Sequence, residues 1–159
     1  MKFFLSTLIF ISPLFSFAQD TIDCFAEKEF LIIGSFREYE PALKVAQKAR
    51  ESLGIEMNLR GLKKCSGPVV GLTFSPEICL NLSPDSCCYS ARGREGEDGI
   101  YISIEYSTAY MAFSKSYYIV MLASGFKDDP KLEEELIKVR EKYPDAYIKG
   151  SKVWMCCMH

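Results

Sequence analysis

The sequence predicts an α+β fold in which a strand–helix–strand unit is duplicated, giving a β-α-β-β-α-β sheet with both helices on one face. The first observation is a shared order of elements in residues 29–62 and 117–159: an apolar run, an apolar stripe with helical spacing and a second strand-like run. The second is a constant offset, because Phe36 precedes Phe126 by 90 positions and four apolar helix positions precede their counterparts by the same number.

In the first unit, the apolar run Phe30–Phe36 predicts a strand, and a helix is expected after it. Pro41 suits the first turn of that helix, and Gly54 suits the position just past its end. Alternation in Ile55–Leu59 then predicts the second strand. The apolar stripe of the helix consists of Ala42, Ala46, Ala49 and Leu53.

In the second unit, Tyr117–Leu122 predicts the third strand. Asp129 is a favourable N-cap for the second helix, with Pro130 directly after it. Pro144 ends this helix, and Ala146–Ile148 begins the last strand. The apolar stripe consists of Leu132, Leu136, Val139 and Tyr143.

In this split arrangement the two first strands lie at the centre of the sheet, and each second strand lies at an edge, antiparallel to its central neighbour. The start of the first strand then lies near the end of the last. We therefore expect Cys24 to lie near Cys156 or Cys157, where a disulfide would join the two ends of the domain. Cys65 follows the second strand, and its expected partner is one of three cysteines before the third strand: Cys79, Cys87 and Cys88.

Residues 1–18 have the three parts of a secretory signal peptide. Lys2 is the basic part, Phe3–Phe17 is an uncharged apolar run, and Ser16 and Ala18 are small residues at the positions that a signal peptidase reads. The run has about 15 residues, fewer than the roughly 20 that span a bilayer, so we expect export and cleavage rather than a retained anchor. Residues 19–159 are then expected to form a single domain with no stable membrane span.

With a formal net charge of −2, the chain lacks the excess of basic residues that is typical of nucleic-acid-binding proteins. In an exported protein, cysteines are expected to form disulfides, and an odd number leaves one thiol over. Met155–His159 groups soft ligands suited to copper or zinc, but it has no Cys-x-x-Cys pair, so we expect neither a metal nor another cofactor. The seven cysteines are Cys24, Cys65, Cys79, Cys87, Cys88, Cys156 and Cys157.

The strand that ends in Gly34-Ser35-Phe36, the helix that leads to Leu53-Gly54-Ile55, and a looser repetition around Ala123–Phe126 resemble the SPOR domain family. This family consists of small ferredoxin-like β-α-β-β-α-β modules of bacterial envelopes that bind peptidoglycan, notably glycan strands without stem peptides. The resemblance covers residues 29–62 and 117–150. It implies a periplasmic or secreted protein of the bacterial cell envelope that binds glycan strands.

The sheet face that meets a glycan in this family departs from the family pattern. A polar residue, often Gln, usually stands two positions before the Gly of the motif, where this chain has Ile32. Because an open apolar face invites aggregation, we expect the segment between the repeats, residues 63–116 (the insert), to cover it. The apolar positions assigned to this face are Phe30, Ile32, Val120 and Leu122.

The insert contains a charged segment, Arg92–Gly99, and an alternating strand, Ile100–Tyr106. The acids of Arg92–Gly99 lack the spacing of a calcium loop, so a flexible, solvated loop is expected. Aromatic rings in and near the insert suit packing on sugars or on a partner protein, although filling a core is their commoner role. The candidate ligand-binding residues are Ser35, Tyr101, Tyr106, Tyr110 and Tyr118.

The sequence shows no catalytic pattern: it lacks a Gly-x-Ser-x-Gly elbow and a phosphate-binding glycine loop, and its single histidine is His159. Glu105 is a possible acid for glycoside cleavage, but an exposed strand glutamate is the commoner case. We expect a non-catalytic binding module with peptidoglycan glycan strands as its ligand. The alternative is an envelope or extracellular protein–protein interaction module that has lost the glycan site.

Overall fold

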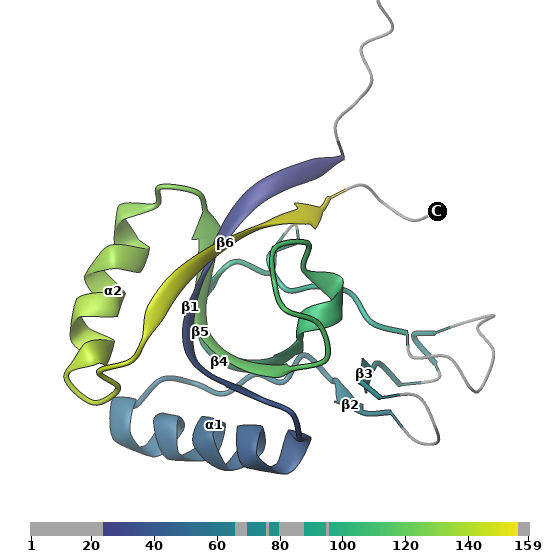
Figure 1. Ribbon diagram of the computed structural model, residues 1–159, viewed down its shortest axis with the longest axis horizontal. Helices are drawn as coiled ribbons and strands as arrows, with labels where there is room; N and C mark the ends of the chain where they lie inside the picture. Colours follow the sequence, from purple (N-terminus) through teal and green to yellow (C-terminus); the bar gives the residue numbers. More distant parts are fainter. Residues whose placement is uncertain (1–23, 66–69, 76, 80–87, 95, 156–159) are drawn as a thin grey trace, which may run out of the picture.

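The computed structural model describes residues 24–65, 70–75, 77–79, 88–94 and 96–155, so the predicted signal peptide lies outside the described residues (Figure 1). The chain forms an α+β fold with one four-stranded sheet, two α-helices and a small two-stranded sheet. Its elements are β1 (Phe25–Phe36), α1 (Tyr39–Leu53), β2 (Lys63–Lys64), β3 (Leu72–Thr73), β4 (Gly99–Tyr106), the 3₁₀-helix η1 (Ser107–Ala109), β5 (Tyr118–Phe126), α2 (Pro130–Arg140) and β6 (Tyr147–Trp154).

The main sheet has the strand order β4-β5-β1-β6, and every neighbouring pair is antiparallel. The expected central position of β1 and β5 is confirmed, as is the edge position of β6 beside β1. Phe25 pairs with Trp154, and the N–H of Met155 donates to the carbonyl of Cys24 at 2.6 Å. The start of β1 and the end of β6 therefore lie side by side, as expected; Cys156 and Cys157 lie outside the described residues.

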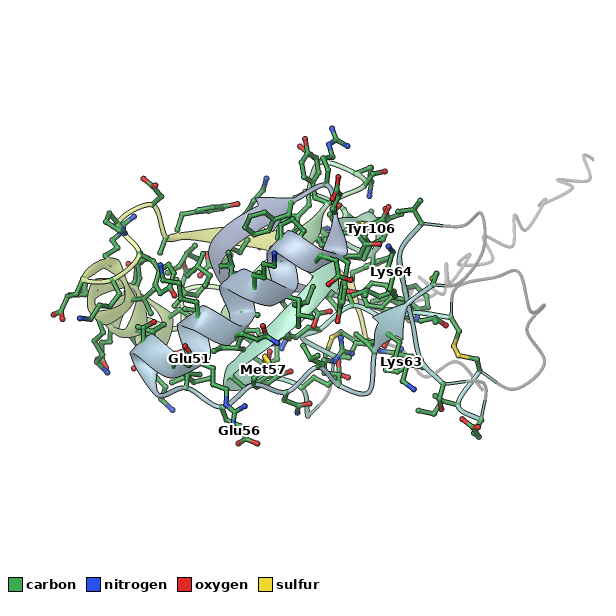
Figure 2. All side chains as sticks on the ribbon, turned by 90° about the horizontal axis from the view of Figure 1, so that it is seen from below. Glu51, Glu56, Met57, Lys63, Lys64 and Tyr106 are labelled. Atoms are coloured by element: carbon green, nitrogen blue, oxygen red, sulfur yellow. A yellow bond between two sulfur atoms is a disulfide. The ribbon has the colours of Figure 1, made fainter. Side chains whose placement is uncertain are left out.

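At the other edge the expected strand arrangement is wrong. The neighbour of β5 is β4 from the insert, where residues 55–59 were expected. That segment runs along the outer side of β4, with one parallel bridge between Met57 and Ile102 (Figure 2). The Asn58 N–H donates to the Ile102 carbonyl, and the Ile102 N–H donates to the Glu56 carbonyl. Because β4 has eight residues, it forms a longer ladder with β5 than the five residues 55–59 offer.

Both helices pack against one face of the sheet, where their buried residues join Leu31, Val120 and Leu122 in one core cluster. Helix α1 ends at Gly54, whose φ of 68° is favourable for glycine. Helix α2 begins at Asp129, whose carboxylate accepts from the Lys131 N–H at 3.0 Å. The predicted helix stripes are buried at Ala42, Ala46, Ala49, Leu132, Leu136 and Val139.

The insert covers part of the opposite face, as expected; Figure 1 shows the two helices on one side of the sheet and much of the insert on the other. Tyr110 and Phe113 of the insert are buried against Phe30 and Ile32. The assignment of Val120 and Leu122 to this face is wrong, because Ile32 pairs with Met121 and alternate strand residues point to opposite faces. The β5 residues on the insert side are Ile119 and Met121.

Cys79 and Cys88 form a disulfide within the insert. This bond excludes both as partners of Cys65, which was expected to bond to one of them or to Cys87, a residue outside the described ranges. Cys24 and Cys65 are disulfide-bonded as well. Within the described ranges, neither helix has the length and apolar character that a bilayer crossing requires.

Candidate functional site

A groove lies on the insert side of the main sheet, between the insert and β6. Its floor is formed by Ile32 of β1 and Ile119 of β5, both buried. Phe113 and Tyr117 of the segment before β5 contribute aromatic rings, and Tyr147 of β6 contributes a third. The volume of about 210 Å³ is below the roughly 300 Å³ at the lower end of enclosed small-molecule pockets. The groove therefore suits contact with one side of a ligand better than complete enclosure.

Polar groups border this groove at Ser35, Ser114 and Lys149. The Lys149 ammonium lies 5.0 Å from the centre of the Phe113 ring. Beside the groove, the Arg37 guanidinium lies over the Tyr117 ring at 3.9 Å. Among the described residues that line the groove, none carries a carboxylate. The groove thus combines flat apolar rings with hydroxyls and positive charge.

Of the predicted ligand-binding residues, the structure brings only Ser35 to this groove. Tyr106, Tyr110 and Tyr118 are at most 7% exposed, so they offer almost no surface to a ligand. Tyr101 is half-buried, and its hydroxyl donates to the Glu97 carbonyl at 2.8 Å.

The other groove residues were not among the predicted ligand-binding residues, although Ile32 was assigned to this sheet face. Tyr147 and Lys149 alternate along β6 and therefore point to the same face. This alternation of an aromatic and a cationic residue on an edge strand was the available signal. Phe113 and Tyr117 gave no such signal, because they lie on a turn segment whose position depends on contacts with the sheet.

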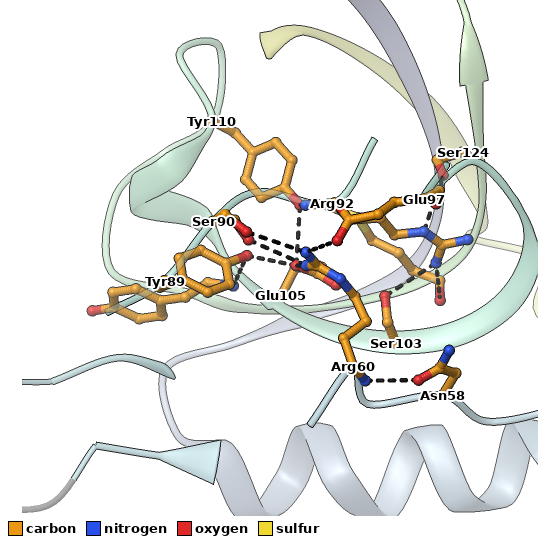
Figure 3. Close-up of polar contacts among 12 residues, drawn as sticks. Asn58, Arg60, Tyr89, Ser90, Arg92, Glu97, Ser103, Glu105, Tyr110 and Ser124 are labelled. Carbon is orange, nitrogen blue, oxygen red and sulfur yellow. Dashed lines mark hydrogen bonds and ion pairs between the residues drawn. The ribbon is translucent and has the colours of Figure 1, made fainter. Parts of the chain in front are cut away.

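A second group of polar residues lies buried where Arg60 and the insert residues Tyr89–Arg92 meet β4 (Figure 3). At its centre is Glu105, whose side chain is fully buried. One of its carboxylate oxygens accepts from Arg60 Nη1 at 2.9 Å, from the Tyr89 hydroxyl at 2.6 Å and from the Tyr110 hydroxyl at 3.2 Å. Burial is the largest cause that raises the pKa of Tyr89 and of Tyr110 well above the ordinary value, followed by the charge of Glu105.

Arg60 connects the segment after α1 to three parts of the insert. Its guanidinium also donates to Glu97 at 2.6 Å and to the carbonyl of Ser90 at 3.2 Å. Burial alone would lower the pKa of Arg60, but the carboxylates of Glu105 and Glu97 outweigh it and raise that pKa. Arg60 has a positive φ of 57°, and its N–H donates to the Asn58 side chain at 2.8 Å. This strained conformation directs the guanidinium under the insert.

The segment Arg92–Gly99 is not the solvated loop that its composition predicts. Arg92 is fully buried and donates to the hydroxyls of Ser103 and Ser124, each at 3.0 Å. Burial lowers the pKa of this guanidinium below its usual range. The adjacent acids Glu97 and Asp98 form ion pairs with Arg60 and with buried Lys28, respectively. Arg92 and Asp98 thus fix this segment to β4, β5 and β1, and Glu97 fixes it to the segment after α1.

The expectation that Glu105 is exposed is also wrong. Its carboxylate is fully buried, and one of its oxygens accepts from an arginine and two tyrosines. In this arrangement the carboxylate does not contact a bound substrate and instead holds the insert on the sheet. We therefore assign this buried cluster a structural role and place the candidate site in the groove.

No group of three or more metal-ligating side chains is present in the part of the chain that the structure describes. Four residues of the soft-ligand segment Met155–His159 lie outside that part. In comparisons with known proteins, no family model, no curated protein and no solved structure matches this chain.

Proposed function

We propose that this protein is a non-catalytic, extracytoplasmic binding module whose groove binds peptidoglycan glycan strands. The observation that carries the proposal is the composition of the groove: Tyr117 and Tyr147 with Ser35 and Lys149, open on the sheet face opposite the helices. The disulfide Cys79–Cys88 supports an oxidising compartment, and the resemblance to SPOR domains supports the ligand class.

The groove has the chemistry that a glycan chain needs. A pyranose ring has apolar C–H faces and a rim of hydroxyls. Tyrosine rings provide flat apolar surface with a polar tip, and Ser35 and Ser114 provide hydroxyls for the rim. Because the groove is open and shallow, it fits consecutive units of a polymer better than an isolated small molecule.

The insert explains why the site occupies only part of the sheet face. Phe30, Ile32 and Met121 would form an apolar surface unsuited to a hydrated sugar chain, and Tyr110 and Phe113 bury them. What stays open is the part beside β6, where Tyr147 and Lys149 lie. We infer that the insert restricts the open part of this sheet surface and leaves the groove beside Tyr147 and Lys149 accessible.

A sedimentation assay with purified peptidoglycan tests this function. We expect the protein to pellet at micromolar concentration, and to pellet more with peptidoglycan whose stem peptides have been removed. Tyr147→Ala should weaken binding about threefold to tenfold, because an aromatic contact contributes roughly 0.5–1.5 kcal/mol.

The matched control is Trp154→Ala, which removes an exposed aromatic residue from the other face of the same strand. This variant should bind like the unmodified protein. Absence of pelleting, or equal losses in both variants, would contradict glycan binding in the groove.

An exposed aromatic pair favours a second candidate, a protein–protein interaction module. Phe25 and Trp154 are 37% and 43% exposed, and their rings meet edge to face at 5.0 Å. Exposed aromatic residues are enriched at protein interfaces. If the protein does not pellet with peptidoglycan, this second function is favoured, and Trp154→Ala rather than Tyr147→Ala should then weaken partner binding.

A further inference from the structure

Lys149 differs from the three lysines that form ion pairs in the described part of the fold. It is half-buried on β6, with its ammonium at the rim of the groove. Lys28, Lys127 and Lys138 each form an ion pair with a carboxylate. Among the described residues, Lys149 has no carboxylate within ion-pair distance. Its charge therefore remains available to a ligand.

The surroundings of Lys149 increase the local positive charge. None of the residues that line the groove is acidic. Arg37 adds a second cation beside it, held over the Tyr117 ring and within 3.5 Å of the Ser116 carbonyl. A chain with a formal net charge of −2 thus presents a positive site on this face. A partly desolvated cation without a carboxylate partner, such as Lys149, favours an anionic ligand.

We propose that Lys149 makes the groove selective for sugars that carry a free carboxylate over neutral sugars. The inference rests on the proposed function, since it assumes that the groove binds a glycan. The aromatic rings contact neutral and acidic pyranoses alike, so they supply affinity without distinguishing the two. The ammonium forms a charge-assisted contact only with the acidic sugar, and so it determines specificity.

Two kinds of glycan carry this group. Peptidoglycan from which the stem peptides have been removed bears a free lactyl carboxylate on alternate sugars. Polyuronates bear a carboxylate on each sugar. Chitin oligosaccharides have a similar β-1,4-linked amino-sugar backbone without any carboxylate, and they serve as the neutral comparison.

The test is isothermal titration calorimetry with three probes of similar length: peptide-free wall glycan, oligogalacturonate and chitin oligosaccharide. We expect the unmodified protein to bind the wall glycan roughly fivefold more tightly than chitin, the factor for a good partly exposed ion pair. Raising the salt concentration should reduce this difference, because salt screens exposed charges.

Lys149→Met keeps most of the side-chain length and removes the charge. It should lower the affinity for the wall glycan to that for chitin and leave chitin binding unchanged, whereas Lys149→Arg should retain the selectivity. Lys152→Met is the matched control, since Lys152 is exposed on the same strand and points to the other face. It should behave like the unmodified protein. Circular dichroism verifies that each variant is folded.

The outcomes separate this inference from the proposed function. Equal binding of wall glycan and chitin, or selectivity that persists in Lys149→Met, overturns the role of Lys149 and leaves glycan binding intact. Binding of oligogalacturonate without binding of wall glycan supports carboxylate selectivity and overturns the peptidoglycan ligand. Absence of binding to all three probes overturns both.

Discussion

At the scale of single residues, the buried pair Arg60–Glu105 is the contact on which the insert most depends. Arg60 lies after α1 and Glu105 lies on β4, so the ion pair joins the first strand–helix unit to the insert. Arg60 also pairs with Glu97, so loss of Glu105 leaves the Arg60 charge partly compensated. It removes the acceptor of the buried Tyr89 and Tyr110 hydroxyls, however, and loss of buried partners costs more than the pair itself contributes.

Glu105→Leu should therefore lower the free energy of unfolding by about 3–5 kcal/mol, measured by urea denaturation. The double variant Arg60→Met/Glu105→Leu should lose less than the sum of the two single variants, because Arg60→Met then no longer leaves the buried Glu105 carboxylate without a cation. Glu27→Gln, at the exposed pair with Lys127, is the control and should leave stability nearly unchanged. Additive losses in the double variant would contradict the importance of this pair.

Little of this residue-scale detail could be predicted from the sequence. Ser35 was predicted as a site residue because it belongs to the Gly34-Ser35-Phe36 motif at the end of the first strand. There the sequence indicates both the place of the residue in the fold and its polar character. In the sequence, Tyr106, Tyr110 and Tyr118 look like Tyr117, since all four are tyrosines in or beside the insert. The first three are buried, however, and Tyr117 is not. The difference depends on which strand face and which neighbour each ring meets, and these contacts join residues far apart in the chain.

At the scale of elements, the two helices show how local signals determine local structure. The N-cap carboxylate of Asp129 accepts a backbone hydrogen bond at the start of α2, whereas Glu38 at the start of α1 makes no such side-chain bond. The end of α1 at Gly54 and the start of α2 at Asp129 were predicted correctly, because caps and glycine act within one turn of the helix end. The predicted end of the second helix at Pro144 is wrong, since α2 ends at Arg140 and Tyr143 lies beyond it.

Asp129→Ala should lower the free energy of unfolding by about 1 kcal/mol, through loss of the N-cap hydrogen bond. Glu38→Ala changes the equivalent position of α1 and should have almost no effect, which makes it the matched control. Urea denaturation of both variants measures the difference. Equal losses would show that the cap of α2 contributes nothing specific.

The strand beside β5 could not be predicted from the same kind of signal. Residues 55–59 and residues 100–106 both alternate in the way that a half-buried strand requires, and one edge of the sheet is available to them. Two properties favour β4 as the neighbour of β5. It forms the longer ladder of backbone hydrogen bonds, and only the segment that contains η1 separates it from β5 in the chain. Alternation alone does not rank two candidate neighbours.

At the scale of the whole molecule, the two helices cover one face of the sheet. The insert covers part of the other face and leaves the groove beside β6 open. The α+β class, the central pair β1–β5 and the cover that the insert provides were all predicted from patterning and from the need to bury apolar surface. The groove beside β6 is the part that no pattern predicted, since it is formed where the insert ends and the sheet continues.

The central claim is that this groove is the ligand-binding surface. The most direct measurement is two-dimensional ¹H–¹⁵N NMR of the protein titrated with peptide-free wall glycan. We predict that the shifts concentrate at Ser35, Tyr117, Tyr147 and Lys149, while amides on the exposed side of α2, such as that of Ile137, do not move. Shifts confined to the helices, or no shifts with saturating glycan, would contradict the account.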